Sequence, residues 1–364
     1  MAEQGDGDGK GELSDQFRRL IRNLGPIPLG QYMAESNAHY YSSRDPLGAA
    51  GDFTTAPEIH QMFGEMIGAW LADLRARAVA AELPGAAAAA YVELGPGRGT
   101  LARDALRVLG MAGGVPRVHL VEGSPALRAR QGDLLGDAVF HDDISDLPDD
   151  RPLLVVANEF FDALPVRQLV MTARGWRERM VGLSGEEFVP VAGDKPMDAA
   201  VPAHLAEAEE GAILETCPAA AAIMRELAAR VARQGGAILA IDYGFDTLRH
   251  GSTFQAVARH ERADPFVAPG TADLTAHVDF SALADAARGA GLDIAGLTGQ
   301  GAFLMALGMG QRASALARAN PSDVEAISAA LERLSAPHQM GTLFKVLGAI
   351  APAWPESAGF AVAE

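Results

Sequence analysis

The part of this sequence best equipped for chemistry is a glycine-rich loop preceded by an acid, Val92-Glu93-Leu94-Gly95-Pro96-Gly97-Arg98-Gly99-Thr100. Glycines let a backbone turn sharply and let a ligand approach without a Cβ in its path. The spacing is G-x-G-x-G, which differs from the G-x-G-x-x-G of dinucleotide-binding loops. An acid two positions before the first glycine can hold an ammonium group, whereas a pyrophosphate favours a loop with no carboxylate nearby. The loop therefore predicts S-adenosylmethionine as cofactor, bound by Glu93, Gly95, Pro96, Gly97, Gly99 and Thr100.

Two more acids follow at the ends of the next apolar runs. The run Val118–Glu122 ends in a carboxylate that can accept hydrogen bonds from both hydroxyls of a ribose. Asp143 directly precedes Ile144, which suits an adenine because the acid accepts from the exocyclic amine while the isoleucine packs on the ring. For this reason Asp143 is preferred to Asp142. One such acid alone is more often a solvated loop residue, but three acids in sheet order favour an adenosyl site.

A further polar group follows a third apolar run, in Asn158-Glu159-Phe160-Phe161-Asp162-Ala163-Leu164-Pro165. Ligands of open α/β sheets bind at the carboxyl ends of the strands, so Asn158, Glu159 and Asp162 are expected to face the transferred methyl group. Methyl transfer needs an acceptor lone pair in line with the S–CH₃ bond and a site that excludes water. If the acceptor is a guanidinium, a fork of carboxylates can hold it. Glu159 is the first candidate for this role, with Asp52 or Glu58 as the second carboxylate.

The elements that position these residues are short apolar runs alternating with helical ones. Such alternation predicts an α/β fold with a mostly parallel sheet covered on both faces. Asp242 and Tyr243 end a strand at the same edge and are expected to line the pocket. The predicted strands are Tyr91–Leu94, Val118–Glu122, Leu153–Ala157 and Ala237–Asp242, and the predicted helices are Thr100–Leu109, Pro125–Leu135 and Ala219–Arg233.

The regions flanking this alternation have different patterns. Residues 1–11 are polar and predict a disordered tail. Residues 12–90 predict an N-terminal helical segment that covers the active site, including one long helix in which Pro57 and Glu58 form the first turn and Ile59 to Leu74 form an apolar stripe. The core is expected at residues 91–350, with insertions near 166–215 and 250–280. The first insertion contains a predicted hairpin at Val166–Gly193, the last strand is Gly341–Ile350, and 351–364 form a C-terminal tail.

The composition narrows the possible functions. The 364 residues carry 30 Lys+Arg against 47 Asp+Glu, a net charge of −17, so no nucleic-acid partner is expected. One cysteine, Cys217, excludes an intramolecular disulfide framework and fits a reducing compartment. The sequence predicts a cytoplasmic protein, since neither a signal peptide nor an apolar stretch long enough for membrane insertion is recognised. Without an H-E-x-x-H pattern, no metal site is expected.

Several long motifs resemble one known family, the MidA family of mitochondrial complex I assembly factors and their bacterial relatives. The similarity runs from about residue 20 to 350. The matching motifs are Gly25-Pro26-Ile27, Tyr32-Met33, Gly51 to Ile59, Glu93 to Thr100, Asn158 to Pro165, Trp176-Arg177-Glu178-Arg179, Asp242-Tyr243-Gly244, Asp273 to Phe280 and Met340 to Leu347.

The resemblance implies a Rossmann-like class I methyltransferase fold, with a mostly parallel seven-stranded sheet and S-adenosyl-L-methionine as cofactor. It also implies a protein substrate, with an arginine of a respiratory complex I subunit as acceptor. Two alternatives stay open: a cofactor-binding assembly factor or chaperone that needs no turnover, and a nicotinamide oxidoreductase, which the glycine spacing disfavours. The oligomeric state also stays open, with a homodimer among the possibilities.

Overall fold

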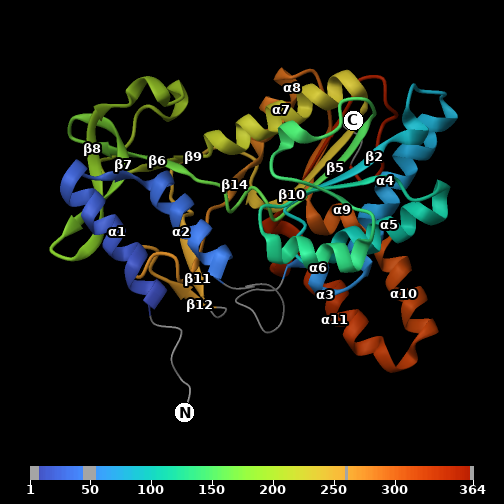
Figure 1. Ribbon diagram of the computed structural model, residues 1–364. Helices are drawn as coiled ribbons and strands as arrows, with labels where there is room; N and C mark the ends of the chain where they lie inside the picture. Colours follow the sequence, from blue (N-terminus) through green and yellow to red (C-terminus); the bar gives the residue numbers. More distant parts are fainter. Residues whose placement is uncertain (1–7, 44–54, 259–260, 361–364) are drawn as a thin grey trace, which may run out of the picture. The chain divides into compact units, whose positions relative to one another are not determined.

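The structure, a computed structural model, describes residues 8–43, 55–258 and 261–360 (Figure 1). The chain divides into two compact units, which are described separately. The accessory unit comprises the ranges 1–53, 162–220 and 247–279. The sheet unit comprises 54–161, 221–246 and 280–364, and it contains the glycine loop.

The sheet unit is built on seven strands in the order β15-β16-β10-β5-β2-β3-β4. The five strands from β10 to β4 are parallel to one another, and β16 runs antiparallel to both β10 and β15. All residues of β2 and β5 are buried, which is why these strands are apolar apart from Glu93 and Asn158. The predicted Rossmann-like fold with a mostly parallel sheet is confirmed; the predicted seven strands form the main path of a sheet that has eight. The strands are β2 (Ala90–Leu94), β3 (Val118–Val121), β4 (Val139–His141), β5 (Leu153–Asn158), β10 (Gly236–Phe245), β15 (Asp293–Gly299) and β16 (Phe344–Ile350).

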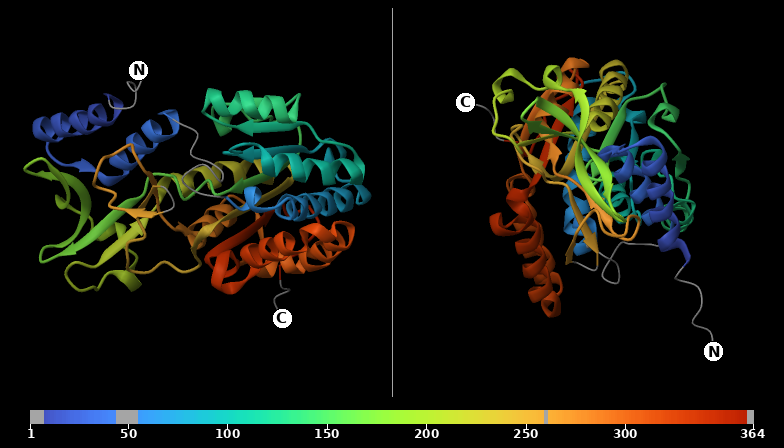
Figure 2. Two further views of the ribbon diagram at one scale, coloured as in Figure 1. Left: turned by 90° about the horizontal axis from the view of Figure 1, so that it is seen from below. Right: turned by 90° about the vertical axis from the view of Figure 1, so that its left-hand side faces the viewer.

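Helices cover both faces of this sheet. Figure 1 shows α7 and α8 on one face and α4, α5 and α6 on the other, while α10 and α11 extend away from the sheet, as Figure 2 also shows. The three helices predicted after the strands are confirmed as α5, α6 and α7. The bounds are α4 (Met62–Ala80), α5 (Thr100–Gly113), α6 (Pro125–Leu135), α7 (Pro218–Gln234), α8 (Phe280–Gly289), α9 (Gln300–Ala306), α10 (Met309–Ala319) and α11 (Val324–Ser335).

Glycines allow α4 and α5 to pack closely. A Cβ at Gly64 would lie 2.7 Å from Asp104 Cβ, and one at Gly68 would lie 2.6 Å from the carbonyl oxygen of Ala105. These separations are shorter than van der Waals contact, so a larger residue would force the helices apart. The glycine loop begins α5, and α4 therefore supports the loop through this contact.

The long helix predicted from Pro57 to Leu74 is wrong in one respect, because the chain breaks at His60. The first part is the four-residue α3 (Ala56–Ile59), and α4 begins at Met62. His60 is extended, with φ −165° and ψ 146°, and its Nδ1 accepts a 3.2 Å hydrogen bond from the Met62 N–H. The side chain thus binds a backbone donor that the start of α4 leaves unpaired. The spacing of the apolar residues does not change at the break, so the hydrophobic periodicity of the sequence does not reveal it.

The accessory unit has an antiparallel sheet in the order β1-β7-β6-β9, with β8 beside β7, and a three-stranded sheet, β12-β11-β13. The hairpin predicted at Val166–Gly193 is part of a longer ladder, since β6, β7 and β8 pair in succession. Phe17, Tyr32 and Phe188 form the aromatic centre of its core. The elements are α1 (Asp8–Leu24), β1 (Ile27–Pro28), α2 (Leu29–Ser43), β6 (Arg167–Thr172), β7 (Gly175–Ser184), β8 (Glu187–Pro196), β9 (Ile213–Thr216), β11 (Gln255–Ala258), β12 (Glu261–Ala263), β13 (Asp273–Thr275) and β14 (Val278–Asp279).

Both chain ends carry more structure than the sequence predicts. Residues 8–11, expected in a disordered tail, begin α1. Residues 351–360, expected in a C-terminal tail, pack on the sheet unit: Trp354 is 8% exposed, and Trp70 Nε1 donates a 3.1 Å hydrogen bond to the Ala358 carbonyl. The last strand starts at Phe344, three residues later than predicted. Both segments are rich in small and polar residues, so the sequence has no hydrophobic periodicity there that would predict this structure.

Candidate functional site

The glycine loop adopts the left-handed backbone conformation at all three of its glycines. The φ angles are 58° at Gly95, 54° at Gly97 and 81° at Gly99. Residues with a Cβ rarely adopt such angles, so the loop geometry requires glycine. The Gly95 N–H donates to the Val121 carbonyl at 3.0 Å, and the Gly99 N–H donates to the Pro96 carbonyl at 2.8 Å. The loop is therefore a fixed turn between β2 and α5.

Glu93 lies in β2 just before this turn and is 2% exposed. The Tyr91 hydroxyl donates a 2.6 Å hydrogen bond to Glu93 Oε2. Burial raises the pKa of Glu93 to about 7, and the tyrosine hydrogen bond offsets only part of that rise. A cation beside this carboxylate would restore its charge, which is the chemistry that an amino-acid ammonium offers.

Glu122 follows β3, and its carboxylate is held by two donors. The Ser124 N–H donates to Oε1 at 2.8 Å, and Gln131 Nε2 donates to Oε2 at 3.2 Å. The same Gln131 nitrogen donates to the Gly97 carbonyl at 2.7 Å, so one fully buried side chain ties the acid to the glycine loop. Burial raises the pKa of Glu122. Sequence reasoning missed Gln131, since a glutamine inside a helix usually lies on its exposed face.

Asp142 and Asp143, the two acids that follow β4, have different hydrogen-bond partners. Arg128 makes an ion pair with Asp142 and also donates to the carbonyls of Glu122 and His141, so it braces this side of the site. Asp143 begins a short turn of 3₁₀ helix, where its Oδ1 accepts a 2.8 Å hydrogen bond from the Ser145 N–H. That hydrogen bond lowers the pKa of Asp143. Ile144 is buried beside it. The choice of Asp143 over Asp142 for the adenine amine stays a prediction.

Glu159 stands where β5 ends, in a strained backbone conformation with φ 49°. Its N–H donates to the Ile241 carbonyl at 2.9 Å. Its Oε1 accepts hydrogen bonds from the Ala56 N–H at 2.9 Å and from Asn158 Nδ2 at 3.2 Å. Within the described chain no donor reaches the buried Oδ1 of Asn158. A buried acceptor without a donor points to a ligand donor at this strand end.

The short helix α3 connects the two candidate acceptor-binding acids. The Ala56 N–H at its start binds Glu159, and Glu58 within it accepts a 2.5 Å hydrogen bond from the Thr100 hydroxyl of α5. Asp162 is a buried residue of the accessory unit. Burial and the charge of Asp273 raise the pKa of Tyr41, and the charge of Asp162 contributes a smaller part of that rise. Asp52 lies outside the described residues.

Asp242 does not line a pocket, contrary to the prediction. It is completely buried, and its carboxylate accepts hydrogen bonds from the Phe161 N–H at 3.0 Å and the Tyr243 N–H at 2.9 Å. Phe161 follows Glu159 by two residues. Asp242 therefore holds the backbone that carries Glu159, because strands β10 and β5 are neighbours.

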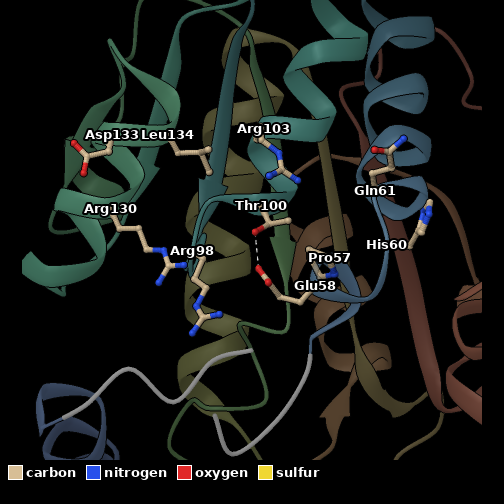
Figure 3. Close-up of a pocket in the computed structure, with 10 residues that line it drawn as sticks. All are labelled: Pro57, Glu58, His60, Gln61, Arg98, Thr100, Arg103, Arg130, Asp133 and Leu134. Carbon is tan, nitrogen blue, oxygen red and sulfur yellow. Dashed lines mark hydrogen bonds between the residues drawn. The ribbon is translucent and has the colours of Figure 1, made fainter. Parts of the chain in front are cut away.

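An open hollow of about 620 Å³ adjoins the glycine loop on the side of α3 and α6 (Figure 3). Its lining includes Thr100, which was predicted to bind the cofactor, but not Glu93, Glu122 or Asp143. Its lining residues are Pro57, Glu58, His60, Gln61, Arg98, Thr100, Arg103, Arg130, Asp133 and Leu134.

The residues around the loop fit S-adenosylmethionine. The left-handed glycines shape the turn before α5, the raised pKa of Glu93 suits an ammonium partner, and Asn158 Oδ1 offers an acceptor. With a sheet of this strand order, the fold and cofactor define a class I S-adenosylmethionine-dependent methyltransferase.

Comparisons with known proteins give the family. A family model for S-adenosyl-L-methionine-dependent methyltransferases matches residues 66–298. The chain is 35% identical to the human mitochondrial protein arginine methyltransferase NDUFAF7, over 89% of this chain and 80% of the human protein. Against the Drosophila melanogaster homologue the identity is also 35%, over 93% and 85%. The chain belongs to the NDUFAF7 family of S-adenosylmethionine-dependent methyltransferases.

A crystal structure from Burkholderia thailandensis supports the cofactor assignment. That protein was crystallised with S-adenosylhomocysteine, is 28% identical to this chain and superposes with a TM-score of 0.83, covering 99% of this chain and 97% of its own. Among the residues described here, no helix has the length and apolar character needed to cross a membrane, and no group of three His, Cys, Asp or Glu residues is placed to bind a metal ion.

Proposed function

We propose that this methyltransferase transfers a methyl group to an arginine of a protein. The observation that carries the proposal is the position of α3, which bears Glu58 and whose Ala56 N–H donates to Glu159 at the carboxyl end of β5. Two carboxylates can hold a planar guanidinium and aim one nitrogen at the methyl group. The curated relatives are themselves named protein arginine methyltransferases, which supports this acceptor.

The site residues divide the work as follows. S-adenosylmethionine, when bound, supplies an electrophilic methyl group on a positively charged sulfur. Glu93, the glycine loop and Glu122 bind and orient that cofactor, with Asp143 and Ile144 at its adenine. Glu159 and Glu58 hold the guanidinium, and a carboxylate accepts the proton that the acceptor nitrogen gives up as its bond to carbon forms. Asn158, Asp162 and Asp52 stay candidates for the acceptor side.

The acceptor protein is proposed by resemblance. The similarity to the complex I assembly-factor family makes an arginine of a respiratory complex I subunit the first substrate to try. The same resemblance keeps open an assembly role that needs the bound cofactor but no turnover.

The test is methyl transfer from radiolabelled S-adenosylmethionine to candidate complex I subunits and to a bacterial lysate, with Glu159→Gln beside the wild type. We expect labelled arginine in an acceptor with the wild type. Glu159→Gln should lower the rate at least about a hundredfold while S-adenosylhomocysteine affinity changes little. A wild-type protein that binds the cofactor but labels lysine, or no residue at all, would contradict arginine methylation.

A further inference from the structure

His60 connects α3 to α4 and binds the start of α4 with both its side chain and its backbone. Its Nδ1 accepts from the Met62 N–H at 3.2 Å, and its carbonyl accepts from the Phe63 N–H at 3.1 Å. Gln61 between them already has helical angles, φ −53° and ψ −24°, whereas His60 is extended. An extended residue whose side chain binds the N–H two positions later has the geometry of an N-cap. His60 therefore caps α4.

The cap requires a neutral ring. Nδ1 accepts a hydrogen bond only while it carries a lone pair, so the ring proton lies on Nε2, and an imidazolium ring offers no acceptor. Burial lowers the pKa of His60, and the charge of Arg312 also lowers it, while Glu65 and Asp104 oppose this shift. The ring is accordingly neutral at pH 7. The charged groups around it are Glu58 of α3, Glu65 of α4, Arg103 and Asp104 of α5, and Arg312 of α10.

The two carboxylates that oppose the shift are themselves paired with arginines. Arg312 Nε and Nη2 donate to the two oxygens of Glu65 at 2.6 and 2.7 Å, and Arg107 binds the same carboxylate. Asp104 is paired with Arg103. Each acid already has a cation beside it, so neither adds an uncompensated negative charge that would favour a proton on the ring of His60.

The helix α3 depends on its contacts for its position. It has four residues, which is too few for a helix to be stable alone. At its start the Ala56 N–H donates to Glu159 at 2.9 Å, and within it Glu58 accepts from the Thr100 hydroxyl. His60 is the residue that ends it. Figure 3 shows the bond between Glu58 and Thr100 and, further along the chain, His60 before α4.

We propose that His60 is a positioning residue for the acceptor site. By capping α4, its neutral ring fixes the break between α3 and α4, and thereby holds Glu58 and the Ala56 N–H in place beside Glu159. The inference rests on the proposed function, which assigns Glu58 and Glu159 to the acceptor. It predicts that protonation of the ring releases the Met62 N–H and loosens α3.

The experiment measures amide hydrogen exchange by NMR at Met62 and Ala56, in the full chain saturated with S-adenosylhomocysteine. His60→Ala should raise both exchange rates about tenfold, since the cap is lost and α3 is released. The asparagine oxygen of His60→Asn can cap a helix and does not titrate, so this variant should keep both rates within about threefold of the wild type. The control is His204→Ala, which removes an exposed histidine of the accessory unit and should change neither rate.

A pH series tests the protonation state. The ratio of wild-type to His60→Asn exchange rates at Ala56 should stay constant while the ring of His60 is neutral and rise as its NMR signal shows protonation. Common effects of pH cancel in this ratio. If His60→Ala does not fold, which calorimetric titration with S-adenosylhomocysteine would show, this comparison decides alone.

Two results would overturn the inference. One is faster exchange at Met62 in His60→Ala with an unchanged rate at Ala56, which would make the ring a cap of α4 without effect on α3. The other is a constant ratio at Ala56 while the ring of His60 titrates. Neither measurement needs an acceptor, so a wild type with the expected rates that methylates no arginine would overturn only the proposed function.

Discussion

The hydroxyl of Tyr91 and the carboxylate of Glu93 form a 2.6 Å hydrogen bond inside β2, directly before the glycine loop. Both side chains are buried, so the acid has lost nearly all contact with water and has gained a single donor. One hydrogen bond does not replace hydration, and the pKa of Glu93 rises to about 7. A cofactor ammonium would supply the positive charge that stabilises the ionised form of this carboxylate.

Cofactor affinity should therefore depend on pH. Below pH 7 Glu93 is mostly protonated in the free protein and must lose its proton to pair with an ammonium. The affinity for S-adenosylhomocysteine should rise up to about tenfold per pH unit and level off above pH 7, with proton release on binding. Calorimetry at several pH values, in buffers of different ionisation enthalpy, measures both quantities. Glu93→Gln should bind weakly with no pH dependence, and a wild type with flat affinity from pH 6 to 8 would contradict the role of Glu93.

The raised pKa of Glu93 also makes the stability of the folded protein depend on pH. Because the folded state holds this proton more tightly than the unfolded state, whose ordinary value is 4.5, Glu93 should lower stability as pH rises from about 4.5 to 7. The full loss above pH 7 is about 3 kcal/mol. The ligand-free Glu93→Gln variant should accordingly melt higher than the wild type at pH 8, and the difference should vanish near pH 4.5.

Gly97→Val should abolish cofactor binding. The backbone at this position has φ 54°, which a β-branched residue does not adopt without strain, and the new side chain would point into the path of the ligand. Calorimetric titration with S-adenosylhomocysteine checks this. Gly132→Ala is the control, since a Cβ there meets nothing within 4 Å and α6 gains a better helix former. Unchanged affinity in Gly97→Val would remove the loop from the site.

Gln131→Leu should weaken cofactor binding about tenfold, because it removes the donor to the Gly97 carbonyl and leaves Glu122 with the Ser124 N–H but without the donor to its Oε2. Gln234→Leu is a matched control: its side chain donates to the carbonyls of Pro148 and Arg151 and contacts none of the site residues. Both variants should lower the melting temperature, and only Gln131→Leu should raise the dissociation constant for S-adenosylhomocysteine. Equal affinities would reduce Gln131 to a packing residue.

Asp242→Asn should lower kcat more than it changes cofactor affinity. The substitution places an amide donor against the N–H of Phe161 or Tyr243, which costs about 1–3 kcal/mol and loosens the turn that carries Glu159. We expect kcat to fall about tenfold while the dissociation constant for S-adenosylhomocysteine stays within about twofold. A kcat equal to that of the wild type would show that the position of Glu159 does not depend on Asp242.

Gly68→Ala should destabilise the sheet unit by about 2 kcal/mol, a cost typical of overpacking. The new Cβ would lie 2.6 Å from the Ala105 carbonyl oxygen and 2.7 Å from its Cα, and backbone cannot rotate away as a side chain can. Chemical denaturation measures the change, again with Gly132→Ala as the reference substitution. An unfolding free energy equal to that of the wild type would mean that α4 and α5 are less closely packed.

The sequence predicted the features that depend on local chemistry. Glycine at Gly95 and Gly97 is required by backbone angles, and buried strands such as β5 must be apolar, so both leave a pattern in the chain. The break at His60 left none, because the apolar residues Ile59 and Met62 keep the spacing of a helix across it. Periodicity reports which face is buried, and it does not report whether the backbone hydrogen bonds are continuous.

The roles of Gln131 and Asp242 depend on contacts between distant parts of the chain. Gln131 meets a carbonyl 34 residues earlier, and Asp242 meets an N–H 81 residues earlier. Both residues lie in elements whose local pattern was interpreted correctly, Gln131 in α6 and Asp242 in β10, yet the pattern does not tell whether a polar side chain faces a ligand or the backbone of a neighbour. The direction is decided by strand order, as it is for Asp242, which binds across from β10 to the loop after β5.

If the carboxylates at the strand ends surround one adenosyl cofactor, a crystal structure of this protein with S-adenosylhomocysteine will show it. The predicted result places both ribose hydroxyls within about 3 Å of the Glu122 carboxylate and the ligand ammonium beside Glu93, directly or through one water. A ligand bound in the hollow of Arg98 and Arg130, or a ribose beyond reach of Glu122, would contradict it.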